Sequence, residues 1–347
     1  MTTRALFNQL ELAFAPICNY DFTVLRDDEG FRRQVQSSTL YLITQRPEIT
    51  FEGVEPITIA GGQVVLQFII RQKGHSSALS CQLPVYQEPY ARDIDKEVQL
   101  RFHYAFPKPE PIPKTFPQNG VRNLLLFYDD GPFIGWLSPE NFIQNYLNEA
   151  IEANIEGPID DFLSYQVHYV GKATEQSVWK RLTGHSTLQD ILSQEYPLHY
   201  GTLPTHEIAV LFLKIQEPIG FLTIGPDDPI PSDIANFMDG ANLPSNKVLS
   251  LDAEKALIQA MKPGYNKVFY NNYPQGKESL SALSLDSYSY QIWSHLILKY
   301  RDGAIRGRPD LFADALLVQK GKPLQVIHQS DALASFQSHS RKRLGDK

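Results

Sequence analysis

The chain has 347 residues, of which 42% are hydrophobic, so it is long enough to bury more than one core and too apolar to be disordered. Its formal net charge of −7 excludes a protein that binds nucleic acid over its whole surface, because such binding depends on lysine and arginine neutralising phosphates. Any nucleic-acid binding is therefore expected in a local patch.

The cysteine content and the hydropathy favour a cytoplasmic protein. Cys18 and Cys81 are the only cysteines, too few for a disulfide framework and without the spacing of metal ligands. The N-terminal segment shows no signal-peptide pattern, and no uncharged apolar run is long enough to span a bilayer. We therefore expect a cytoplasmic location and no membrane partner.

Residues 1–156 are predicted to form a β-rich accessory domain that recognises a protein partner or positions a substrate. Runs of alternating polarity predict strands at residues 40–44, 64–71, 98–106, 123–128 and 133–136. The last two are joined by Asp129-Asp130-Gly131, which is typical of a hairpin turn. Residues 107–117 hold five prolines and are predicted to be an extended connector. Ser138 and Pro139 predict the start of a helix that runs toward Ala153.

Residues 157–275 are predicted to form an α+β domain. A strand at residues 162–170 precedes a helix, a break at Gly184 and a second helix from Ser186. The apolar run at residues 207–215 predicts a buried strand.

Three further segments complete the predicted order. Residues 217–249 are rich in proline, glycine and aspartate and are predicted to be a surface insertion. Asp252 is then predicted to cap a helix that ends at Pro263-Gly264. Residues 276–347 are predicted to form a C-terminal β extension with a basic tail.

One stretch of the α+β domain carries groups suited to a phosphodiester. Tyr169 and Lys172 lie at the end of the predicted strand, on either side of a Val-Gly pair. The helical run that follows contributes three more polar groups, from Lys180, Arg181 and His185. Guanidinium and ammonium groups bind phosphate oxygens, so the stretch predicts a phosphate-binding site. A carboxylate able to hold a metal follows downstream at Glu254, ahead of Asn266.

These residues, in this order and on these element types, resemble the GIY-YIG nuclease family, specifically a divergent bacterial branch of it. The quoted motifs are Tyr-Val-Gly-Lys-Ala, Lys-Arg-Leu-Thr-Gly-His and Ala-Glu-Lys-Ala-Leu-Ile, ahead of Lys-Pro-Gly-Tyr-Asn, and the resemblance covers about residues 162–273. It implies a small mixed β-sheet flanked by helices, preceded here by the β-rich domain. It further implies a metal-dependent endonuclease, with DNA favoured over RNA, in bacterial defence, restriction or competition.

The resemblance also implies the role of each residue. Glu254 would hold one Mg²⁺ or Mn²⁺, an ion that prefers oxygen ligands and keeps several waters. Arg181 would grip a non-bridging phosphate oxygen. Tyr169 would orient or deprotonate the attacking water, with Lys172 helping to lower the pKa of its phenol. Asn266 would hold the glutamate or a neighbouring strand.

Two more side chains complete the implied substrate contacts. His185 would touch the substrate or assist proton transfer. Lys180, together with Lys172 and Arg181, would bind the phosphate backbone.

The sequence departs from the family at the first half of its signature. No Gly-Ile-Tyr stands on an earlier strand, and the nearest upstream tyrosine is Tyr165. Strand alternation predicts that Tyr165 and Tyr169 project from one face. Either tyrosine is therefore a candidate for the base.

Three interpretations remain open from the sequence. The first is the endonuclease, and the second is a catalytically silent module of the same fold that binds nucleic acid or protein. The missing Gly-Ile-Tyr and the acidic total charge favour the second, whereas the presence of Glu254, Arg181 and Asn266 together favours the first. The third is an unrelated β-rich binding protein, in which each of these residues serves its helix or strand alone.

Overall fold

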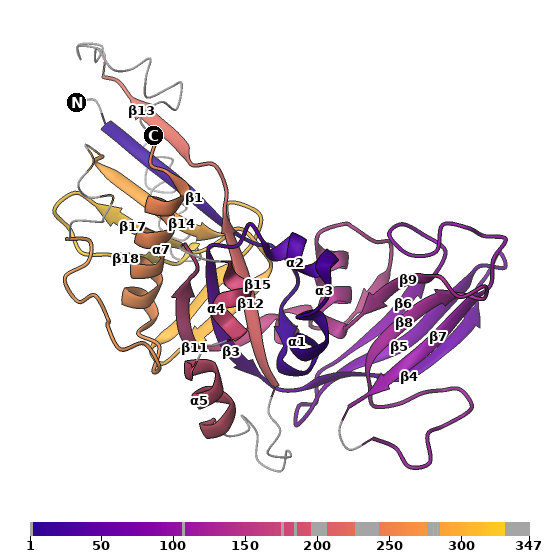
Figure 1. Cartoon of the computed structure of the whole chain (residues 1–347). Coiled ribbons are helices and arrows are strands. Elements are labelled where there is room, and N and C mark those ends of the chain that lie inside the picture. Colours follow the sequence, from indigo (N-terminus) through magenta and orange to yellow (C-terminus); the bar gives the residue numbers. More distant parts are fainter. Residues whose placement is uncertain are drawn as a thin grey trace, which may run out of the picture. The chain divides into compact units, whose positions relative to one another are not determined.

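The fold was obtained as a computed structural model, in which helices and strands are both abundant and two separate β-sheets are present (Figure 1). The expectation of an α+β fold is therefore confirmed. The structure describes residues 3–105, 108–174, 177–183, 186–195, 207–225, 243–275, 280, 283 and 285–329.

The chain divides into two compact units that do not follow the sequence in order. Unit 1 contains residues 1–45, 164–195 and 208–347, and unit 2 contains residues 46–163 and 196–207. The first 45 residues thus group with the later part of the chain. In the sequence, residues 46–163 of unit 2 lie between the first and second segments of unit 1.

The sheet of unit 1 is mixed and has eleven strands among the described residues. Its main path runs β16-β15-β11-β3-β12-β1-β14-β17-β18, with β2 on β12 and β13 on β1. Strand β11 pairs antiparallel with β3 and parallel with β15. The strands are β1 (Thr3–Leu12), β2 (Ile17–Cys18), β3 (Leu40–Arg46), β11 (Ser164–Lys172), β12 (Glu207–Ile215), β13 (Ile219–Thr223), β14 (Ser287–Ile292), β15 (Leu296–Tyr300), β16 (Gly303–Gly307), β17 (Ala315–Gln319) and β18 (Gln325–Ile327).

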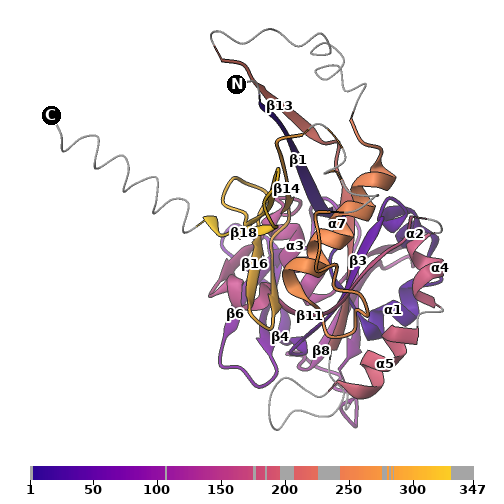
Figure 2. The same ribbon diagram turned by 90° about the vertical axis from the view of Figure 1, so that its left-hand side faces the viewer.

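Helices cover both faces of the central strands of this sheet (Figure 2). One face packs against α7 (Asn246–Met261). The other face packs against α1 (Asn19–Leu25), α2 (Glu29–Val35), α4 (Val178–Thr183) and α5 (Ser186–Gln194). Strand β3 is consequently buried along its whole length, with Leu40 and Leu42 in the α7 core and Tyr41 and Ile43 in the other.

Helix α7 begins earlier than the sequence predicts. Its N-cap is Ser245, whose hydroxyl accepts a hydrogen bond from the Val248 amide. The prediction that Asp252 caps the helix is wrong, because Asp252 is buried within it. Its carboxylate accepts hydrogen bonds from the hydroxyls of Tyr273 (2.6 Å) and Tyr290 (2.8 Å).

The early start of α7 also changes the predicted insertion at residues 217–249. Its ends contain β13 and the first turn of α7, while residues 226–242 lie outside the described residues.

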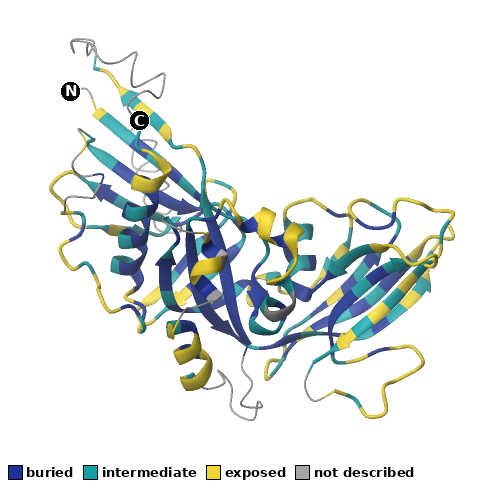
Figure 3. Ribbon diagram, viewed as in Figure 1, coloured by how far each residue is buried: buried dark blue, intermediate teal, exposed yellow. Residues whose placement is uncertain are grey.

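Unit 2 is built on an antiparallel sheet with the order β10-β6-β5-β4-β8-β7, and β9 pairs with β8. Buried side chains follow every second position of its central strands (Figure 3). The predicted hairpin is formed by β8 and β9, and Ser138 caps α3, as predicted. The elements are β4 (Ile49–Thr58), β5 (Val64–Gln72), β6 (Ala78–Pro84), β7 (Val98–Tyr104), β8 (Val121–Tyr128), β9 (Phe133–Leu137), α3 (Pro139–Leu147), β10 (Asn154–Glu156) and the 3₁₀ helix η1 (Ile159–Leu163).

None of the helices in the described ranges is long and apolar enough to cross a membrane.

Candidate active site

A pair of tyrosines lies where β3 and β11 run side by side. Tyr169 comes from β11 and Tyr41 from β3, and their ring centroids are 6.0 Å apart with the planes tilted by 35°. Tyr41 is buried, whereas Tyr169 is partly exposed. Both belong to the core on the α4 side of the sheet. The sequence does not single out Tyr41, because most of unit 2 separates it from Tyr169 along the chain.

Gly171 is required by this pair. It lies opposite Tyr41 in the strand register. A Cβ atom at this position would be 2.5 Å from Cζ of Tyr41 and 2.6 Å from Cε1 of Tyr169, well inside van der Waals contact. The glycine of the Tyr-Val-Gly motif is therefore explained by the two rings that lie against it.

Arg181 on α4 reaches the two phenols. A hydrogen bond with Tyr41 is the largest cause that raises the pKa of Arg181 above its ordinary value, and Tyr169 raises it further. Burial raises the pKa of Tyr41, and Tyr169 raises it further, while Arg181 lowers it. Burial has the largest effect, so the pKa of the Tyr41 phenol is raised overall.

Lys172 and Glu254 form an ion pair beside this group. The Lys172 Nζ is 2.7 Å from Oε2 of Glu254, and the side chains are 31% and 10% exposed. Glu254 comes from the middle of α7 and Lys172 from the end of β11, so the pair joins helix to strand. Burial raises the pKa of the Glu254 carboxyl, while Lys172, Lys255 and Arg181 lower it. Arg181 makes the smallest of these contributions.

The side chain of Asn266 is hydrogen-bonded to the backbone of β11. Its Oδ1 accepts a hydrogen bond from the Val170 amide (2.9 Å), and its Nδ2 donates to the Val170 carbonyl (2.8 Å). The side chain thus replaces a neighbouring strand at the residue between Tyr169 and Gly171. Lys262, in the left-handed conformation with φ 46°, ends α7 and turns the chain toward this position.

Tyr165 is not brought to this cluster. It is buried in the α7 core together with Val167 and Val170, whereas Tyr169 packs on the opposite face. The register of β11 on β3 shifts between Val167 and Tyr169, and this bulge reverses the alternation. The prediction that Tyr165 and Tyr169 share a face is therefore wrong.

The remaining two predicted residues lie apart from the tyrosines or outside the description. Lys180 is exposed on α4, next to Arg181 in sequence, and lines a separate hollow. His185 lies outside the described residues.

The acidic side chains that the structure describes around the cluster suit one kind of metal site. Within the described ranges, no three His, Cys, Asp or Glu side chains come together as metal ligands. Among the described residues, Glu254 is a carboxylate whose pKa Arg181 lowers, and it comes from α7, which packs on the face of the sheet opposite the phenols. A single carboxylate fits Mg²⁺ or Mn²⁺, which retain waters, and does not fit zinc, which takes three or four protein ligands.

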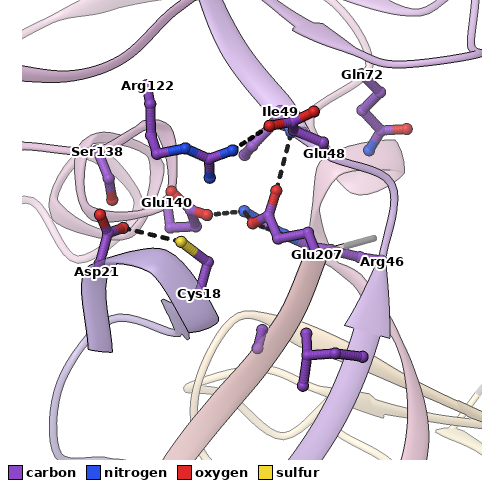
Figure 4. A network of polar contacts seen from close by, with 12 residues as sticks. Cys18, Asp21, Arg46, Glu48, Ile49, Gln72, Arg122, Ser138, Glu140 and Glu207 are labelled. Atoms are coloured by element: carbon purple, nitrogen blue, oxygen red, sulfur yellow. Dashed lines mark hydrogen bonds and ion pairs between the residues drawn. The ribbon is translucent and has the colours of Figure 1, made fainter. Parts of the chain in front are cut away.

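A second polar cluster lies in unit 2 (Figure 4). Arg46 pairs with Glu207 at 2.8 Å and also with Glu140, and all three side chains are buried. Glu207 also accepts a hydrogen bond from the Ile49 amide (3.1 Å). Nearby, Arg122 and Lys73 pair with Glu48. Three cations thus face three carboxylates, and this balance is typical of a structural network.

Comparisons with known proteins returned no matching family model, no matching curated protein and no matching solved structure.

Proposed function

We propose that unit 1 is a divalent-metal-dependent endonuclease that hydrolyses phosphodiester bonds, with DNA favoured over RNA. The observation that carries the proposal is that Arg181 acts on both the tyrosine pair and the Lys172–Glu254 pair, since it lowers the pKa of Tyr41 and of Glu254. These groups come from two strands and two helices. An arginine, a carboxylate and hydroxyl donors are the groups that phosphodiester hydrolysis needs.

Three features of unit 1 support the resemblance to GIY-YIG nucleases. Tyr41 supplies a tyrosine on an earlier strand, where the Gly-Ile-Tyr motif is missing. The strand that carries it pairs directly with the strand of Tyr169. A later helix, α7, presents Glu254 toward the end of β11. Unit 2 would then be an insertion between the two tyrosine strands, available for a protein partner.

The side chains of this site divide the reaction among them. Arg181 would bind a non-bridging oxygen of the scissile phosphate and stabilise the charge that develops there. Tyr41 is buried and would hold the Arg181 guanidinium in place by accepting its hydrogen bond. Tyr169 is more exposed and would orient the attacking water. Glu254 would hold the divalent ion, which withdraws charge from the phosphate and from the leaving oxygen. Because the ion would replace Lys172 as the partner of Glu254, the Lys172 ammonium would then bind the substrate.

The test is cleavage of plasmid DNA and of RNA by the full chain with Mg²⁺, Mn²⁺ or EDTA. We expect cleavage of DNA that EDTA abolishes and that falls by about 10²- to 10³-fold in Arg181→Ala. Glu254→Gln, which keeps the shape of the side chain, should be equally impaired. Arg301→Ala is the matched control, since Arg301 is an exposed arginine in a β-turn of the same unit. Equal products from all variants, or none under every condition, would exclude a nuclease.

The second candidate is a catalytically silent module that binds nucleic acid or protein. One observation favours it: the Glu254 carboxylate is already paired with the Lys172 ammonium, which competes with a metal. This candidate predicts binding without cleavage in every metal condition. It also predicts that Mg²⁺ leaves the thermal stability of the protein unchanged, because no metal binds Glu254.

A further inference from the structure

A hollow of about 770 Å³ opens in unit 1 between the corner that joins α1 to α2 and the start of α4. Figure 2 shows α2 beside α4 on one side of the sheet. The residues that line the hollow are mostly long polar side chains: Arg26, Asp27, Glu29, Arg32, Arg33, Val35, Gln36, Ser177, Val178 and Lys180.

The charge of the hollow is opposite to that of the whole chain. It is lined by four cations against two carboxylates, which leaves an excess of two positive charges, while the chain carries −7. Arg26 and Arg32 remain 54% and 45% exposed although both reach Asp27. A polyanion could therefore be attracted here and not to the surface at large.

The arginines are held in place by their own backbone. Arg32 Nε donates to the Arg26 carbonyl (2.6 Å), and Arg33 Nε donates to the Glu29 carbonyl (3.3 Å). Ser177 caps the start of α4 by accepting from the Lys180 amide (3.4 Å). The cations are thus partly ordered before any ligand arrives, which lowers the entropy cost of binding.

The helices that line the hollow pack into the same hydrophobic core as Tyr41. Phe31 and Val35 of α2 and Val178 and Leu182 of α4 belong to the same hydrophobic cluster as Tyr41. Lys180, on the wall of the hollow, precedes Arg181, which contacts the phenols. Lys180 and Arg181 are consecutive on α4, so Lys180 is the cation through which a nucleic-acid strand bound at Arg181 would reach this hollow.

We propose that this basic hollow binds the sugar–phosphate backbone of DNA next to the scissile phosphate. The inference rests on the proposed function and names the surface that holds its substrate. Its contacts are to phosphates and carry no sequence information. Binding should therefore be strong at low salt and similar for duplexes of unrelated sequence.

The experiment measures binding of a labelled duplex to the full chain in EDTA, by fluorescence anisotropy over a series of KCl concentrations. A plot of log affinity against log salt concentration has a negative slope. We expect Arg33→Ala and Lys180→Ala each to reduce the magnitude of this slope by about 1. The double variant should lower it by about 2. Arg33→Lys keeps the charge and should keep the slope. Arg301→Ala, an exposed arginine outside the hollow, should behave as wild type.

Two results would overturn the inference. The first is a wild-type protein without affinity for the duplex, and the second is a double variant whose slope equals that of wild type. Because EDTA prevents metal-dependent cleavage, the result is independent of activity. Binding that depends on the hollow without any cleavage in Mg²⁺ would retain this surface and reject the nuclease. If the double variant still cleaves DNA in Mg²⁺ and its binding is unchanged, this surface would be rejected and the nuclease retained.

Discussion

Replacing Asn266 by alanine removes the side chain that holds β11 at Val170. Two hydrogen bonds are lost, at 2.9 and 2.8 Å, and both end on the backbone of a residue that is fully buried. Leaving a buried donor or acceptor unpaired costs about 1–3 kcal/mol, so two unpaired groups cost about 2–6 kcal/mol. The loss lies between Tyr169 and Gly171, so cleavage should fall together with stability.

The assay is hydrogen exchange at the Val170 amide, read beside the midpoint of denaturant unfolding. We expect exchange at Val170 to accelerate in Asn266→Ala and the unfolding midpoint to fall. Asn271→Ala is the control, because Asn271 is an exposed asparagine in the turn that follows and its removal should change stability by no more than about 0.5 kcal/mol. Unchanged protection of Val170 in Asn266→Ala would refute the reasoning.

Three further predictions concern the glycine, the carboxylate and the ion network. Gly171→Ala should abolish cleavage while circular dichroism stays native, because its Cβ would overlap the ring of Tyr41; full activity would contradict the packing. Burial raises the pKa of the Glu254 carboxyl above its ordinary value of 4.5. As pH falls through this raised pKa, Glu254 becomes protonated, so the Mg²⁺ concentration needed for half-maximal cleavage should rise. In the absence of metal, the same raised pKa means that ionising Glu254 costs stability as pH rises through this window, an effect that Glu254→Gln should remove in thermal melts. Arg46→Met should destabilise unit 2 by about 3–5 kcal/mol, since it leaves two buried carboxylates unpaired, whereas Arg92→Met at an exposed pair should change stability by less than about 1 kcal/mol in urea unfolding.

Local signals in the sequence predicted the local parts of the fold. The turn chemistry at Asp129-Asp130-Gly131 and the cap at Ser138 depend only on neighbouring residues, and both are found as predicted. The start of α7 was missed because a serine and an aspartate both suit an N-cap. The pattern alone does not reveal that Asp252 is buried by Tyr273 and Tyr290.

The candidate site could be predicted only where its residues follow one another along the chain. Tyr41 and Tyr169 are brought together by the pairing of β3 with β11, and pairing between distant strands leaves no trace in periodicity. The bulge after Val167 is equally invisible, since one extra residue moves Tyr169 to the other face of the sheet. Both misses concern long-range strand register.

The most direct test of the central claim is the rate of Mg²⁺-dependent DNA cleavage by Tyr41→Phe and Tyr165→Phe, measured against wild type. Each variant removes one hydroxyl from a buried tyrosine of unit 1, on neighbouring strands. The site built from Tyr41, Tyr169, Arg181 and Glu254 predicts a large loss of rate in Tyr41→Phe and a near-normal rate in Tyr165→Phe. A normal rate in Tyr41→Phe, or a loss confined to Tyr165→Phe, would contradict it.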